Sequence, residues 1–215
     1  VVIYDRGIQR EVINVGTGLV QERHTSDFWV FEGVDKRDYA VSGTWGADGT
    51  TYFWDVTNPA QIRKIDSIQV DARTVNDVKV SEDGRISVIS REGASSRRNG
   101  IVIIDTTNPY DVNIISEYTT NLTGGVHNVF IYQDHVFALS NGERFYVINI
   151  EDPKNPYEVG MFEIGEKGQA IHDVWIEDGI AYSSNWKHGV YIIDVGNGVA
   201  GGSPSNPVVM SNYSY

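Results

Sequence analysis

One pattern recurs four times along this chain and limits what it can fold into. A run of apolar residues ends in an acid or its amide at four markers, Asp55, Asp105, Asn149 and Asp194. Successive markers are 50, 44 and 45 residues apart. A second shared element precedes each marker, as SDFWV at 26–30, NDVKV at 76–80, HNVFI at 127–131 and HDVWI at 172–176. Two elements that recur together indicate a duplicated structural unit.

Each unit divides into four short β-runs separated by turn residues, most clearly in the last unit. There we expect strands at 171–176, 180–184, 190–195 and 207–213. Asp-Gly pairs at 178–179 and 83–84 favour type I′ hairpins, in which both central residues need positive φ. No amphipathic helix is evident. A period of about 40–50 residues built from four strands predicts an all-β fold, a β-propeller of four-stranded antiparallel blades.

The repeat predicts one continuous array over residues 1–215. We expect blades at 21–70, 71–122, 123–168 and 169–215, with 1–20 as the end of a preceding blade. VVIYD at 1–5 is similar to a third strand, and 10–15 would be the fourth. Eighteen strands do not divide into whole blades, so we expect a partial propeller of about four and a half blades, with more blades before Val1, beyond Tyr215, or both.

The third strands, such as IVIID at 101–105, are continuously apolar. An exposed sheet would alternate apolar and polar residues, so this pattern predicts strands buried on both faces between neighbouring blades.

Charge and composition exclude several classes of partner. The net charge of −12 and pI near 4.7 argue against a nucleic-acid partner, which requires a basic surface. They also argue against docking on an anionic membrane surface, and no apolar stretch is long enough for direct membrane insertion. The chain has no cysteine. It lacks G-x-S-x-G, H-E-x-x-H and P-loop motifs, so the sequence predicts no catalytic residue and no cofactor.

The most promising polar cluster lies at the start of the first strands, which line the central channel of a propeller. We therefore expect Asp27, Asp77, His127, His172 and Asp173 around one mouth of the channel. Imidazole and carboxylate are suitable ligands for a divalent metal, so these five residues are the candidate metal ligands. The alternative is that they satisfy backbone groups at the blade boundaries. Repetition in every blade favours this structural interpretation, because a metal site needs few ligands, and no metal is predicted.

Two further sets of residues recur with the period. Trp45 and Trp186 end equivalent second strands and could contact a partner, because tryptophan is enriched at interface hot spots; the alternative is that they pad the blade edge. The marker acids are expected to bond nearby backbone N–H groups in Asx-type turns. Asn149 keeps the acceptor and loses the charge, which favours a structural role for the whole set.

These residues resemble the LVIVD-repeat family of bacterial extracytoplasmic proteins, named for the apolar third strand that ends in Asp. The resemblance rests on segments 23–33, 76–85, 124–129, 172–186 and 192–207. It implies a β-propeller that is periplasmic, secreted or surface-anchored, with no established enzymatic activity. The expected function is a non-enzymatic scaffold for protein–protein interaction. The alternative is a metal-dependent, hydrolase-like enzyme that acts at the channel mouth through His127 and His172.

Overall fold

The protein is all-β, as the sequence predicts. The computed structural model describes residues 2–5, 8–11, 24–165 and 170–214. These residues form four four-stranded antiparallel sheets and one two-stranded hairpin. In this part of the chain the helical structure is a single 3₁₀ turn, η1 (Trp186–His188).

The strands follow one another in chain order. Sheet one holds β3 (His24–Glu32), β4 (Asp38–Trp45), β5 (Thr50–Asp55) and β6 (Arg63–Gln69). Sheet two holds β7 (Val78–Val80), β8 (Ile86–Arg91), β9 (Gly100–Asp105) and β10 (Asn113–Tyr118). Sheet three holds β11 (Val126–Tyr132), β12 (His135–Ser140), β13 (Arg144–Asn149) and β14 (Tyr157–Phe162). Sheet four holds β15 (Asp173–Glu177), β16 (Ile180–Ser184), β17 (Val190–Asp194) and β18 (Val208–Tyr213). The hairpin pairs β1 (Val2–Asp5) with β2 (Ile8–Glu11).

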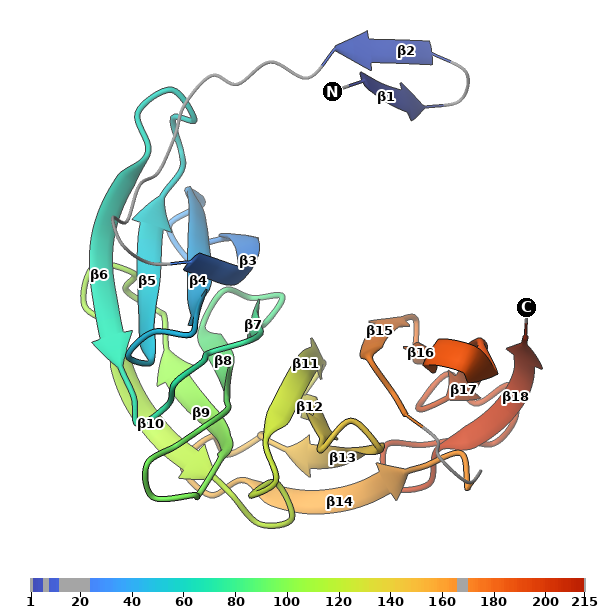
Figure 1. The fold of residues 1–215 in the computed structure, drawn as a ribbon. Helices are drawn as coiled ribbons and strands as arrows, with labels where there is room; N and C mark the ends of the chain where they lie inside the picture. The colour runs from blue at the N-terminus through green and yellow to red at the C-terminus, as the bar shows by residue number, and fades with distance from the viewer. Residues whose placement is uncertain (1, 6–7, 12–23, 166–169, 215) are drawn as a thin grey trace.

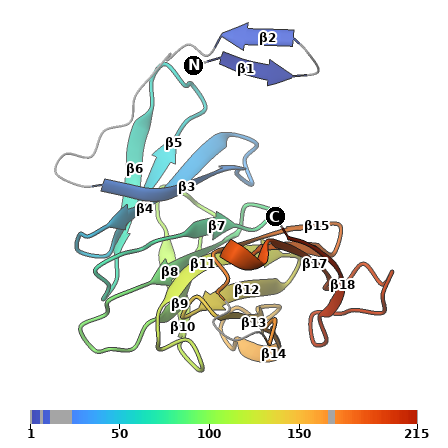
Figure 2. The ribbon, with the colours of Figure 1, turned by 45° about the vertical axis from the view of Figure 1, so that its right-hand side comes forward.

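The four sheets form an arc in which the first strands face inward (Figure 1). Within each sheet the strands pair in chain order, from the inner first strand to the outer fourth strand. The turned view shows the same arrangement, with β7, β11 and β15 inside and β6 and β18 at the outside (Figure 2). The described strands do not close the arc, because β18 pairs only with β17 and β1 pairs only with β2.

Consecutive sheets pack face against face. We call the face that a sheet turns to the next sheet its trailing face, and the opposite face its leading face. The trailing face of sheet three holds Phe130, Phe137, Phe145, Val147 and Phe162. It packs on the leading face of sheet four, made of Val174, Ile176, Ala181, Ile193 and Val195. Burying each larger apolar side chain contributes about 1.5–3 kcal/mol, so this interface is a main source of stability.

The other two interfaces have the same construction. Between sheets one and two, Val41 and Phe53 pack with Val78, Val80 and Ile104. Between sheets two and three, the packed residues are Val88, Ile101, Ile103, Val129, Val136, Ile148 and Ile150. The core is therefore a series of three inter-sheet layers rather than one central mass.

Some local expectations need correction. The strand expected at 171–176 is β15, which begins at Asp173, and the strand expected at 10–15 begins at Ile8; its positions 12–15 lie outside the described residues. The type I′ turn is present at Asp178 (φ 50°) and Gly179 (φ 73°). It is absent at 83–84, where only Gly84 has positive φ, because a longer loop closed by Gly84 N–H to the Ser81 carbonyl (2.9 Å) makes the connection.

The third strands are not all buried on both faces. Residues 100–104 of β9 are fully buried, whereas β5 and β13 contain half-buried positions and β17 is half-buried over Val190–Ile192. β17 belongs to the last sheet, whose trailing face has no described sheet against it. The apolar run of a third strand therefore shows that both of its faces can be buried, but not how much of each face is buried in the fold.

Candidate functional site

The starts of the four first strands lie close together, and the polar residues there surround a hollow of about 340 Å³, which we call the mouth. All five candidate metal ligands line it. They are Asp27, Asp77, His127, His172 and Asp173. The repeat brings them together because each stands at or next to the same position of successive first strands.

Two of the carboxylates hold neighbouring sheets together. Asp27 Oδ2, in sheet one, accepts hydrogen bonds from the Val78 N–H (3.3 Å) and from Lys79 Nζ (2.9 Å), both in sheet two. Asp77 Oδ2 accepts from the Val129 N–H in sheet three (2.7 Å). Lys79 also donates to Asp77 Oδ1. These inter-sheet carboxylate bonds carry the structural role that repetition favours.

The protonation states of this pair are shifted in opposite directions. Burial, followed by the hydrogen bond with Asp27, raises the pKa of Asp77 to about 8. Burial alone would also raise the pKa of Asp27, but hydrogen bonds from Asp77 and Lys79 lower it below its ordinary value.

The two histidines lie on neighbouring walls of the mouth with ring centroids 5.2 Å apart, edge to face. His127 Nδ1 lies 3.2 Å from Glu92 Oε1, and this hydrogen bond raises the pKa of His127. His172 makes its recorded side-chain contacts with rings, those of His127 and of Trp186 (4.9 Å). His127 therefore has an acidic partner, whereas His172 contacts aromatic rings.

The side chains at the mouth are not arranged as a set of metal ligands. Within the described residues, no three His, Cys, Asp or Glu side chains are placed to hold one ion. Lys79 occupies the space between Asp27 and Asp77. An ammonium group already neutralises the carboxylates that would have to supply the ligands.

Trp45 and Trp186 hold the same repeat position after the second strands, and we call this position the rim; Trp186 contacts His172 of the mouth. Trp45 is 54% exposed and contacts the His24 ring edge-on at 6.4 Å. Trp186 is 60% exposed, contacts the His172 ring edge-on, and has a φ of 47°. A bulky residue in the left-handed region carries a backbone strain of about 1–3 kcal/mol. The turn η1 therefore keeps Trp186 in a strained conformation.

Sequence reasoning missed Glu92, the partner of His127. The pairing of Val78 with Ile89 and of Val174 with Ser183 places Glu92 at the repeat position that Trp186 holds in sheet four. Comparison of the second strands across the repeat would have found it. The motif search did not, because Glu92 belongs to neither shared element.

Sequence reasoning also missed the side chains that fill the inside of the arc. The position two residues after the polar pair of each first strand holds Trp29, Lys79, Phe130 and Trp175. Trp29 lies 6.2 Å from the Phe130 ring and 6.1 Å from the Trp175 ring, and Lys79 Nζ lies 5.0 Å above the Trp29 ring. Sheets one and four thus meet through their side chains across the arc, and these rings lie beneath the mouth.

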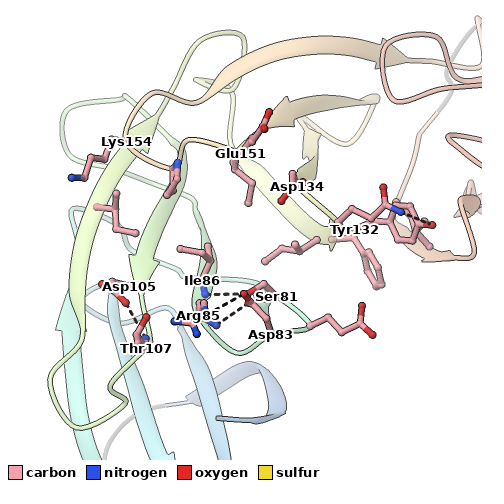
Figure 3. A pocket seen from close by; sticks show the side chains of 18 of the residues that line it. Ser81, Asp83, Arg85, Ile86, Asp105, Thr107, Tyr132, Asp134, Glu151 and Lys154 are labelled. Carbon is pink, nitrogen blue, oxygen red and sulfur yellow. Dashed lines mark hydrogen bonds and ion pairs between the residues drawn. The ribbon is translucent and has the colours of Figure 1, made fainter. Parts of the chain in front are cut away.

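A larger hollow of about 930 Å³ lies at the other end of the first strands. Asp134 and Glu151 of sheet three face Ser81 and Arg85 of sheet two across it (Figure 3). Its lining includes seven carboxylates and two basic side chains, over apolar residues such as Phe130 and Ile176. This end of the molecule therefore presents negative charge around an apolar floor.

The marker acids have the expected turn geometry. Each Oδ1 accepts a hydrogen bond from the N–H two residues on, at Thr57 (3.1 Å), Thr107 (2.9 Å), Glu151 (3.0 Å) and Gly196 (3.1 Å). The last marker, Asp194, also accepts from Gly198, Ala200 and Gly202. The glycine-rich loop of sheet four is thus wrapped around a carboxylate of the chain itself.

Comparison with known proteins adds information on the fold. No family model matches this sequence, and no curated protein is similar to it. A solved structure described as a hypothetical selenium-binding protein from Sulfolobus tokodaii is similar, with a TM-score of 0.66 and 13% sequence identity. The match covers 88% of this chain and 55% of that one, so this chain spans about half the length of its structural neighbour. The likeness concerns the fold alone.

Among the described residues, no helix has the length and apolar character needed to cross a membrane.

Proposed function

We propose that the four sheets are blades of a β-propeller. Radial packing of four-stranded antiparallel sheets, with the first strand of each inside, is the architecture of propeller blades. Supporting features are the strand order from inner to outer strand and the arc of sheets (Figure 1). The resemblance to the LVIVD-repeat family is part of this proposal, and with it an extracytoplasmic location.

We further propose that the chain is a non-enzymatic scaffold that binds a protein partner, with the rim of the mouth as the contact surface. One observation carries this proposal. Trp45 and Trp186 occupy the same repeat position at the rim and are both more than half exposed. Tryptophan is enriched among residues that dominate binding energy, because one ring buries a large area with little loss of side-chain freedom.

The engagement of the mouth carboxylates supports a scaffold over an enzyme. Asp27 and Asp77 are occupied by inter-sheet bonds and by Lys79. A general acid or base must instead reach a substrate proton. The metal-dependent hydrolase remains the alternative, but it lacks a third ligand beside His127 and His172 in the described chain, so we build no reaction on them.

The proposal is tested by comparing captured partners across variants. The wild-type chain, a Trp45→Ala/Trp186→Ala double variant and a Val199→Ala control are immobilised and exposed to an envelope extract of the native cells. Val199 is 73% exposed and lies in the loop between β17 and β18, away from the rim. We expect a partner that the wild type and the control retain and the double variant loses.

Binding of that purified partner is then measured by titration calorimetry. Loss of one hot-spot residue costs about 2 kcal/mol or more, so the double variant should bind at least about thirtyfold more weakly. Equal affinity for the double variant and the wild type would overturn the rim as the contact surface.

A further inference from the structure

Most of the residues that line the large hollow of about 930 Å³ belong to sheets two and three. Ile86 and Ile115 of sheet two and Ile131 of sheet three contribute to its floor and are only partly buried. The apolar layer between these two sheets is therefore left open at this end. Sheets one and four flank the pair on either side (Figure 1), so the opening lies inside the described array and not at one of its ends.

The same end of the interface between sheets one and two is closed by side chains. Asp55, which is 3% exposed, accepts hydrogen bonds at Oδ2 from Arg37 Nη2 (2.7 Å) and Arg63 Nη2 (2.6 Å). The hydroxyl of Tyr110, from sheet two, donates to the same oxygen (2.8 Å). The Tyr110 ring also contacts the Tyr39 ring edge to face at 6.2 Å. Two guanidinium groups and two rings thus fill this end of the first interface.

The corresponding positions between sheets two and three leave the space unfilled. Strand pairing gives the matching positions of sheets one and two as Asp55 and Asp105, Tyr39 and Ile86, Arg63 and Asn113. An aliphatic side chain therefore replaces a ring, and an amide replaces a guanidinium group. Lys154 follows its marker at the same distance as Tyr110. In the described chain no hydrogen bond or ion pair joins it to Asp105 (Figure 3).

The Asp105 carboxylate keeps the capacity to bind a cation. It is exposed, and its Oδ1 accepts the Thr107 N–H (2.9 Å), as Asp55 Oδ1 accepts the equivalent N–H of its own turn. In Asp55 the other oxygen binds two guanidinium groups, whereas Asp105 Oδ2 has no such partner among the described residues. The arginine of the lining, Arg85, is paired with Asp83 (3.5 Å). The hollow therefore offers the acceptor of the first interface without its donors.

We propose that the large hollow binds a segment of a protein partner in which an arginine side chain lies next to an apolar side chain. The guanidinium group donates to Asp105 Oδ2, as two guanidinium groups of the chain itself donate to Asp55. The apolar side chain rests on Ile86 and Ile131. Charge complementarity selects this partner, because the lining carries seven carboxylates and two basic side chains and a guanidinium group matches a carboxylate in shape.

This surface is separate from the rim. The rim follows the second strands at the end of the sheets that holds the mouth, whereas the large hollow lies at the other end of the first strands. The proposal goes beyond the contact at Trp45 and Trp186 and does not depend on it, since it rests on sheets two and three alone.

The test uses a fluorescein-labelled synthetic peptide of repeated Arg-Leu-Gly units, whose binding is measured by fluorescence anisotropy. Two matched peptides carry glutamine in place of arginine, or serine in place of leucine. Asp105→Asn removes the charge of the site and keeps the size of the side chain. Glu143→Gln is the control, because it makes the same charge change at a half-exposed residue between β12 and β13 that does not line the hollow.

A second variant fills the site from within the chain. Asn113→Arg places a guanidinium group at the position from which Arg63 binds Asp55, so it should bind Asp105 and exclude the peptide. Asn113 is exposed, so the fold should be kept. Its melting temperature should equal or exceed that of the wild type, and lost binding cannot then be attributed to unfolding.

We expect the wild type and Glu143→Gln to bind the Arg-Leu-Gly peptide with similar affinity, and both matched peptides to bind more weakly. Asp105→Asn and Asn113→Arg should each bind the peptide at least about tenfold more weakly, because a hydrogen bond between charged groups is lost. In NMR spectra of the wild type, the peptide should shift the backbone amides of Thr107 and Ile131 and leave that of His127 unchanged.

A wild type that does not bind the peptide overturns the proposal. Full binding by Asp105→Asn or by Asn113→Arg also overturns it, since either result shows that Asp105 is not the contact. Equal weakening by Asp105→Asn and Glu143→Gln does so as well, because attraction to the net charge of the protein would then account for the binding. If the peptide with serine binds as tightly as the one with leucine, the apolar floor takes no part and the proposed partner chemistry is wrong.

Discussion

The Oδ2 atom of Asp77 lies 2.7 Å from the backbone nitrogen of Val129, 52 positions further along the chain and in the next sheet. The same carboxyl group contacts Lys79 through its other oxygen and takes a hydrogen bond from the Val78 N–H (2.9 Å). One side chain thereby joins sheet two to sheet three and fixes the lysine that lies over the Trp29 ring. Asp77, a candidate metal ligand in the sequence, therefore links two neighbouring sheets by hydrogen bonds.

Removal of this carboxyl group should therefore destabilise the protein strongly. We expect Asp77→Ala to lower the free energy of unfolding by about 3 kcal/mol, because it leaves Lys79 and the Val129 N–H buried with lost partners. Urea unfolding measures the change. Asp173→Ala is the matched control at the same repeat position; its recorded bond stays within one strand, so the cost should be under about 1 kcal/mol. Equal losses for both variants would contradict the inter-sheet role.

His127 should give the protein a pH dependence near neutrality. The hydrogen bond with Glu92 raises the pKa of His127. Its contribution to stability is then fully present below the unfolded value of about 6.5 and is lost as the pH rises through the higher folded pKa. We expect Glu92→Gln to lower the His127 pKa, measured by NMR titration of the ring, and to flatten this part of the stability profile. An unchanged titration in the variant would show that Glu92 is not the cause.

Replacing both histidines of the mouth should lower the stability of the protein and leave its metal content unchanged. His127→Asn/His172→Asn removes the bond to Glu92 and two ring contacts, worth about 1–2 kcal/mol together. For a chain of this size the melting temperature should fall by about 3–6 °C. Metal analysis of chelator-free wild-type protein should give substoichiometric values that the double variant does not change. Stoichiometric metal in the wild type that the variant loses would instead support the enzyme alternative.

The sheets could be predicted from the sequence because the residues that determine each strand and turn are close in the chain and recur in every unit. The apolar run before Asp55 or Asp194 recurs with its turn, and each copy must form the same strand to bury it. Convergence of the first-strand polar residues at one mouth followed from the same period. These features depend on the position within a unit and not on which sheets are neighbours.

The chemistry of the mouth could not be predicted in this way, because it depends on single departures from the repeat. Lys79 replaces an aromatic residue at a position that holds Trp29 and Phe130 elsewhere, and this one change turns two candidate ligands into an ion-pair network. Glu92 likewise replaces a rim tryptophan and becomes the partner of His127. Only the sheet-to-sheet arrangement shows which side chain each departure meets.

The loop after β17 offers a test of the marker acids in acid solution. Burial alone would raise the pKa of Asp194, but hydrogen bonds from the N–H groups of Gly196, Gly198, Ala200 and Gly202 lower it to about 2. The stability that it contributes is fully present above the unfolded value of about 3.9 and is lost as the pH falls towards 2.

Asp194→Asn should therefore lower the melting temperature by several degrees at pH 7 and by much less near pH 2, where about half of the wild-type carboxylates are protonated. Asp105→Asn is the matched control, because this marker is exposed and its recorded bond is the single one from the Thr107 N–H. Thermal unfolding by circular dichroism across this pH range measures both. A constant difference between wild type and Asp194→Asn from pH 7 to pH 2 would show that the charge of the carboxylate does not hold the loop.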